Sequence, residues 1–128
     1  MKGYTVLRPD EQRFDAPTWR PDVRDRTLVE VSLYANLRHS RASLWRYPPR
    51  TNGRRHRQLV QEEVFVILSG GFVMLLGDPP ERVELPPRSI VVVEPGTPLQ
   101  LRNESDEEGL IFIYGAPADP ASELVPDP

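Results

Sequence analysis

The sequence has no cysteine and only one lysine, Lys2, among 16 basic residues. The lack of cysteine excludes disulfide bridges and thiolate chemistry. The N-terminus also lacks a basic segment followed by an apolar stretch, the pattern of a secretory signal. We therefore expect a cytoplasmic protein. A formal net charge of −3 gives no support to nucleic-acid binding.

Long apolar runs are also missing. A membrane-spanning helix needs roughly 18 consecutive apolar residues. The longest apolar stretch, residues 64–76, is interrupted by Ser69-Gly70-Gly71, as a turn would interrupt it. We expect no membrane partner. A length of 128 residues corresponds to one domain that buries a single core.

Segments of helical period are missing too, and short strand-like segments take their place. Clusters of Gly, Pro, Asn and Asp separate these segments. We expect strands over residues 4–7, 27–33, 41–47, 54–58, 64–68, 72–76, 82–85, 90–93, 99–102 and 110–114. This spacing predicts an all-β single domain, either a sandwich or a closed barrel. It divides the chain into an N-terminal arm with a short strand (1–26), a barrel (27–115) and a surface tail (116–128).

Two spaced motifs stand inside this strand pattern. They read Arg50-x5-His56-x-Gln58-x4-Glu63-x6-Gly70 and Arg88-x5-Glu94-x-Gly96-x2-Leu99-x3-Asn103. Over residues 41–115 the chain resembles the cupin superfamily, whose motifs are G-x5-H-x-H-x(3,4)-E-x6-G and G-x5-P-x-G-x2-H-x3-N. The register matches throughout. The resemblance implies a small single-domain cupin, a jelly-roll β-barrel also described as a double-stranded β-helix.

The motifs differ from the family pattern at the metal ligands. In metal-containing cupins, two histidines, the glutamate and a third histidine hold one divalent ion. Gln58 and Leu99 occupy two of these positions. An amide oxygen is a poor ligand for a transition metal, and leucine offers none. The resemblance therefore implies a degenerate metal site and no cofactor. If a divalent metal binds, its ligands would be His56, Gln58 and Glu63.

Strand alternation predicts which side chains face the barrel interior. Glu63 shares a face with Phe65, and a carboxylate on an apolar strand is costly to bury. We expect Glu63 and His56 to be the acid–base residues of the site. The expected pocket residues are Gln58, Trp45, Tyr47, Phe65, Leu99 and Leu101.

Structural roles are an alternative for the polar residues. His56 would then be a hydrogen-bonded core residue, and Glu63 would form an ion pair with an arginine or with His56. A cluster of arginines beside the barrel mouth favours either an anionic ligand or a solvated loop. It comprises Arg50, Arg54, Arg55 and Arg57.

Four functions remain open from the sequence. The first is a metal-free barrel that binds a small molecule through His56, Gln58 and Glu63. The second is a metal-independent isomerase or cyclase with the same residues, and the third is a metal-dependent oxygenase or isomerase. The fourth is a structural or regulatory dimerisation module. We also expect a homodimer, joined through residues 4–7 or the edge strand 27–33, because an exposed sheet edge must be covered.

Overall fold

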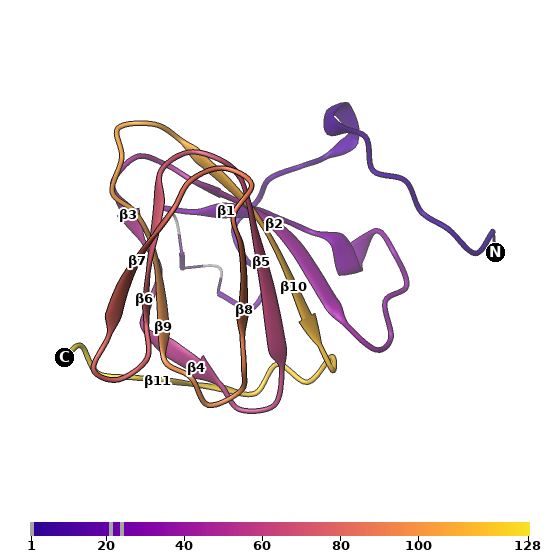
Figure 1. Cartoon of the computed structure of the whole chain (residues 1–128). Helices are drawn as coiled ribbons and strands as arrows, with labels where there is room; N and C mark the ends of the chain where they lie inside the picture. Colours follow the sequence, from indigo (N-terminus) through magenta and orange to yellow (C-terminus); the bar gives the residue numbers. More distant parts are fainter. Residues whose placement is uncertain (1, 21, 24) are drawn as a thin grey trace.

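Two antiparallel sheets enclose the core in the computed structural model of this chain, which describes residues 2–20, 22–23 and 25–128 (Figure 1). The first sheet consists, in spatial order, of β1 (Thr27–Glu30), β2 (Arg41–Tyr47), β10 (Gly109–Ala116), β5 (Glu62–Ser69) and β8 (Ile90–Val93). The second consists of β11 (Ser122–Leu124), β4 (His56–Gln58), β9 (Leu99–Asn103), β6 (Phe72–Leu76) and β7 (Glu81–Leu85), with β3 (Thr51–Asn52) paired to β9. The all-β, single-domain jelly-roll prediction is confirmed.

The core lies where the inward faces of the two sheets meet. In β5, Phe65 and Ile67 are buried, whereas Leu68 faces outward and is exposed. This alternation follows from the two-residue period of a strand. The core comprises Tyr47, Phe65, Ile67, Phe72, Met74, Leu85, Val93, Leu99, Leu101 and Ile111.

Helical structure in the described chain is limited to two short 3₁₀ turns, η1 (Pro9–Glu11) and η2 (Val31–Leu33). No helix among these residues is long and apolar enough to cross a membrane. The η2 turn corrects the strand expected over residues 27–33. The strand ends at Glu30, which pairs with Ser43, and the chain then turns toward the start of β2.

The strand expected at residues 4–7 is also absent. The described part of the chain supplies no neighbouring strand for this segment, and the arm points away from the barrel in Figure 1. An extended segment needs hydrogen-bond partners to become a strand. The arm joins the barrel further on, where Asp15 and Leu28 exchange backbone hydrogen bonds of 3.0 and 2.9 Å.

The surface tail after residue 115 contributes a short, exposed strand, β11, to the second sheet. β11 pairs with β4, and Val125 is buried and donates its N–H to the Arg55 carbonyl. The Arg55 side chain is itself buried and donates to the carbonyls of Gly77 and Pro126. Composition predicts a polar tail, but the short strand β4 needs a neighbour at its edge.

Asn103, the last residue of the second motif, has a structural role. Its side chain is fully buried, and Nδ2 donates to the carbonyls of Tyr47, Pro48 and Glu107. Its Oδ1 accepts from the N–H and the hydroxyl of Ser105. Asn103 therefore holds the β9–β10 turn against the end of β2.

The two motif positions at which arginine replaces glycine have left-handed backbone. Arg50 has φ +57° and Arg88 has φ +76°. The Arg88 N–H donates to the Ile67 carbonyl at 2.8 Å, which holds the turn in this conformation. In this conformation the Cβ of any residue other than glycine is too close to the backbone, which destabilises the turn.

We predict that Arg88→Gly raises the free energy of unfolding by about 1 kcal/mol, because it removes this strain at φ +76°. Urea denaturation measures the change. Arg88→Ala keeps the Cβ and is the control, with stability expected within about 0.5 kcal/mol of wild type. A glycine variant no more stable than the alanine variant contradicts the prediction.

Candidate functional site: a cavity at one end of the barrel

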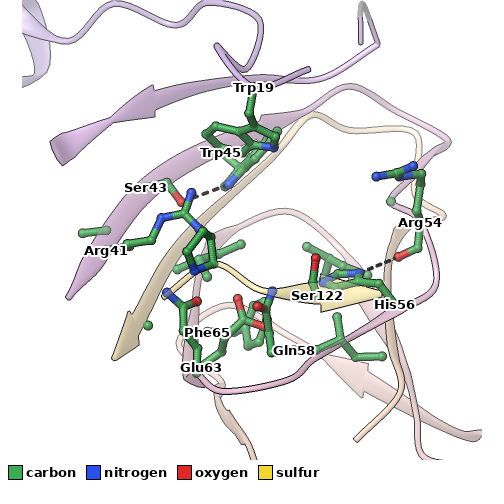
Figure 2. Close-up of a pocket in the computed structure, with 18 of the residues that line it drawn as sticks. Trp19, Arg41, Ser43, Trp45, Arg54, His56, Gln58, Glu63, Phe65 and Ser122 are labelled. Carbon is green, nitrogen blue, oxygen red and sulfur yellow. Dashed lines mark hydrogen bonds between the residues drawn. The ribbon is translucent and has the colours of Figure 1, made fainter. Parts of the chain in front are cut away.

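A cavity of about 670 Å³ opens between the two sheets. This volume lies within the range of roughly 300–1,000 Å³ that is typical of small-molecule sites. Strands β2, β4, β5, β9 and β10 line it, and Trp19 from the arm and Ser122 from β11 complete its walls (Figure 2).

One wall of the cavity is aromatic. Trp45 and Tyr47 project inward from β2, with Trp19 beyond them toward the arm. Each ring packs edge-to-face on the next, with centroid separations of 6.2 Å for Trp19–Trp45, 6.1 Å for Trp45–Tyr47 and 5.5 Å for Tyr47–Phe72. The series gives the cavity an apolar, aromatic side.

Leucine and phenylalanine line the inner part of the cavity. Leu99, Leu101 and Phe65 are almost fully buried there. Leu99 lies directly opposite His56 in the β4–β9 pair. All six residues that the sequence predicts for the pocket therefore line this cavity, together with His56 and Glu63.

Three polar side chains line the same cavity and carry unsatisfied atoms. Gln58 Oε1, Gln61 Nε2 and Glu63 Oε1 are buried and have no hydrogen-bond partner in the described structure. Leaving one buried polar atom unpaired costs about 1–3 kcal/mol. Three such atoms around one cavity indicate that a ligand or water supplies their partners.

Sequence reasoning missed Gln61. The side chain is 2% exposed and packs on Gly115 of β10, where an added Cβ would lie 2.7 Å from Gln61 Oε1. A glycine inside a strand marks the close approach of another group. Gly115 was therefore the one feature of the sequence that indicated a close contact here, but the sequence does not show which side chain approaches it.

Glu63 is a buried carboxyl with one charged group, Arg41, close enough to shift its pKa. Burial raises the pKa of its carboxyl to about 7, and only Arg41 opposes this shift. No ion pair of Glu63, with His56 or with an arginine, exists among residues 2–20, 22–23 and 25–128. The ion pair of the structural alternative is therefore not found among these residues. At neutral pH the carboxyl is present in both protonation states.

His56 is fixed by its own loop. Its Nδ1 donates to the Arg54 carbonyl at 2.9 Å, which leaves Nε2 as a hydrogen-bond acceptor (Figure 2). Burial lowers the pKa of the ring, so the imidazole is neutral at pH 7. His56 and Glu63 face one cavity without a hydrogen bond between them in the described structure.

The donor set of this cavity does not match a transition-metal site. At the four ligand positions of the family pattern it offers the imidazole of His56, the amide oxygen of Gln58 and the carboxyl of Glu63, with Leu99 in the remaining position. Within the described ranges no three His, Cys, Asp or Glu side chains are grouped closely enough to hold an ion. Catalytic zinc sites, for comparison, keep three strong protein ligands.

The four arginines that the sequence places at the barrel mouth do not form one cluster. Arg54 lines the cavity, whereas Arg50 and Arg57 pair on the surface with Asp106 and Glu123. Arg55 is buried in the structural contacts described above. Two further arginines that the sequence did not indicate also line the cavity: Arg26 from the segment before β1, and Arg41 from the start of β2.

A jelly-roll barrel with a ligand-sized cavity at one end defines the class of this protein. The family model of the cupin domain matches residues 43–114, more than half of the chain. The chain belongs to the cupin family. Comparison with curated proteins gives no match.

Solved structures support the fold. The polyketide cyclase RemF from Streptomyces resistomycificus has a TM-score of 0.80 at 14% identity, over 95% of this chain and 85% of that one. A sugar phosphate isomerase of the cupin superfamily from Silicibacter pomeroyi has a TM-score of 0.71 at 17% identity, over 88% and 75%. An uncharacterised double-stranded β-helix protein from Klebsiella pneumoniae has a TM-score of 0.67 at 19% identity, over 79% and 83%. At these identities the likeness concerns the fold alone.

We predict that Glu63 makes the protein less stable as the pH rises. The folded chain holds the Glu63 proton up to a pKa of about 7, compared with an ordinary value of 4.5, so its stabilising contribution is complete below pH 4.5 and is lost as the pH rises through about 7. The difference between these two pKa values corresponds to a change of at most about 3 kcal/mol in the free energy of unfolding, at roughly 1.36 kcal/mol per pKa unit. Glu63→Gln should therefore gain stability relative to wild type between pH 4.5 and pH 8.

Urea denaturation at both pH values measures this difference. Glu62→Gln is the matched control, because Glu62 is the exposed neighbour on the same strand. Its stability relative to wild type should stay constant with pH. Parallel curves for wild type and Glu63→Gln would show that Glu63 titrates normally.

Proposed function

We propose that this cupin binds a small organic molecule in the barrel cavity and needs no transition metal to do so. The observation that carries the proposal is the set of three unsatisfied buried atoms, on Gln58, Gln61 and Glu63, around a cavity of about 670 Å³. Apolar walls with a few convergent polar groups are typical of ligand sites. The weak donor set supports the metal-free part of the proposal.

A second function, metal-independent proton transfer, is favoured by Glu63. A carboxyl with a pKa of about 7 can take a proton from a bound molecule and return it near neutral pH. The amides of Gln58 and Gln61 lie on the same cavity and can donate hydrogen bonds to an oxygen on which charge develops. Proton abstraction next to a carbonyl group needs this combination. Two of the structurally similar proteins are a cyclase and an isomerase, which agrees with this chemistry.

We predict that the protein binds 2-tetralone, a bicyclic ketone, and accelerates exchange of its α-protons in D2O. Binding should shift the indole N–H resonances of Trp19 and Trp45, the two tryptophans of the chain, because both line the cavity. Exchange, followed by proton NMR, should increase as the pH rises through about 7, since the ionised Glu63 is the base. Glu63→Gln should lose at least about 100-fold of the protein-dependent rate, the lower range for a general base.

Glu62→Gln is again the control and should exchange at the wild-type rate. Elemental analysis of protein purified without chelator should give less than about a tenth of an equivalent of metal. If 2-tetralone binds but its α-protons do not exchange faster, the proton-transfer function is contradicted and the binding function stands. Unshifted indole resonances at millimolar 2-tetralone, or metal at near one equivalent, contradict the proposal.

We also propose a homodimer, formed through the outer face of the first sheet. Strand β8 is the edge of this sheet, and its outward side chains Ile90 and Val92 are 68% and 64% exposed. On the arm, Tyr4 and Val6 are 70% and 56% exposed and have no strand partner in their own chain. The second copy is the proposed occupant, because its arm brings an apolar strand-like segment to an apolar sheet edge.

The arm already reaches this face within one chain. Leu7 lines a groove of about 340 Å³ on the outer side of the sheet with Val66, Leu68 and Phe112. Residues 4–6 extend beyond the groove, so they are available to a neighbouring copy.

We predict that wild type sediments as a dimer and that Ile90→Asp with Val92→Asp gives a folded monomer. Two buried carboxylates would be left without partners at the interface, which is strongly unfavourable. Leu59→Asp, at an exposed loop leucine away from β8, is the control and should remain dimeric. A monomeric wild type at micromolar concentration contradicts the homodimer.

A further inference from the structure

Arg41 at the mouth of the cavity is a charged group without a protein partner. It begins β2, lines the cavity, and forms no side-chain hydrogen bond or ion pair with any residue that the structure describes. Most other arginines around the barrel have such partners. Arg26 and Arg57 are examples, paired with Asp25 and Glu123.

Neither Glu30 nor Glu63 forms an ion pair with Arg41, although the charge of Arg41 acts on Glu63 and lowers the pKa of its carboxyl against the larger effect of burial. Glu30 accepts two hydrogen bonds from Thr18, at 2.8 Å from its N–H and 3.0 Å from its hydroxyl. Glu63 lies deeper and is not within ion-pair distance of any described residue. The guanidinium therefore keeps its donors available, and a planar fork of N–H groups matches a carboxylate in two hydrogen bonds.

One indole ring, that of Trp19, lies beside this guanidinium. The guanidinium lies 5.3 Å from the Trp19 ring, and Trp19 packs edge-to-face on Trp45, as Figure 2 shows. The bonds from Thr18 to Glu30 hold the Trp19 segment to β1. A guanidinium positioned by an indole loses less side-chain entropy when it binds a ligand.

We propose that the ligand is a planar aromatic carboxylic acid, with its rings against Trp45 and Tyr47 and its carboxylate on Arg41. This inference rests on the proposed binding function and deepens it by naming the ligand class. Arg26 and Arg54 also line the cavity and add positive potential to its mouth. The polar atoms of Gln58, Gln61 and Glu63 then receive the ring substituents at the inner end.

Two naphthalene probes that differ only in charge test the inference. Calorimetry on the full chain at pH 7.5 compares 2-naphthoate with the neutral 2-naphthamide. Wild type should bind the carboxylate at least ten-fold more tightly, and salt should reduce this preference because charge carries it. Arg41→Met keeps the length of the side chain without its charge. It should lose most of the preference for the carboxylate, and only the positive potential of Arg26 and Arg54 should remain.

Two further variants complete the experiment. Arg82→Met is the control, because Arg82 lies on β7 outside the cavity and pairs with Glu104, and the preference should be unchanged. Arg41→Lys keeps the charge without the fork and should give an intermediate preference. It also replaces Arg41→Met in the comparison if that variant does not fold, as judged by circular dichroism.

The outcomes separate the two proposals. Equal binding of both probes to wild type, or no binding of either, overturns the aromatic-acid inference. So does an unchanged preference in the Arg41 variants. The binding function stands in all these cases if 2-tetralone shifts the indole resonances, and it fails on its own if that ketone does not bind.

Discussion

The inward face of β5 is the constraint on which the rest of the structure depends. At one end of the strand Phe65 and Ile67 pack against the second sheet and form the closed part of the core. At the other end Glu63 occupies the same face, where an apolar side chain would extend the core. A buried carboxylate prevents close apolar packing around it, because its desolvation is costly. The barrel is therefore filled by apolar side chains at one end and contains the cavity at the other.

The open end uses polar groups that the fold does not satisfy. Gln61 reaches the cavity because Gly115 leaves space beside it, and its amide nitrogen remains unpaired. Leu99, where the family pattern has histidine, contributes apolar surface opposite His56. The positions that hold the metal ligands in the family pattern thus carry both polar and apolar side chains here. Of the family's ligand types, only His56 and Glu63 are kept. The proposed function uses these groups for hydrogen bonding and proton transfer.

Sequence and structure agree best where the information is local. The spacing of the two motifs predicts the turns and the strand register, and the left-handed backbone at Arg50 and Arg88 shows why the family pattern has glycine there. Alternation along β5 predicts that Glu63 and Phe65 face inward. The arm and the tail were predicted less well. Residues 4–7 are not a strand, and β11 emerges from a proline-rich tail, because in both cases the outcome depends on whether a distant strand is available as a partner.

By itself the sequence determined the all-β class and the inward faces of β2, β5 and β9, since strand period and turn chemistry act over a few residues. The jelly roll followed from the resemblance of the two motifs to the cupin pattern. Only the tertiary structure decided which polar groups share the cavity. Arg41, Gln61 and Trp19 come from three separate segments, and nothing in their local sequence relates them to Glu63. Two further properties also depend on the complete packing: the high pKa of Glu63, and the lack of an ion-pair partner for Arg41 among the described residues. Both depend on which segments of the folded chain lie around the side chain.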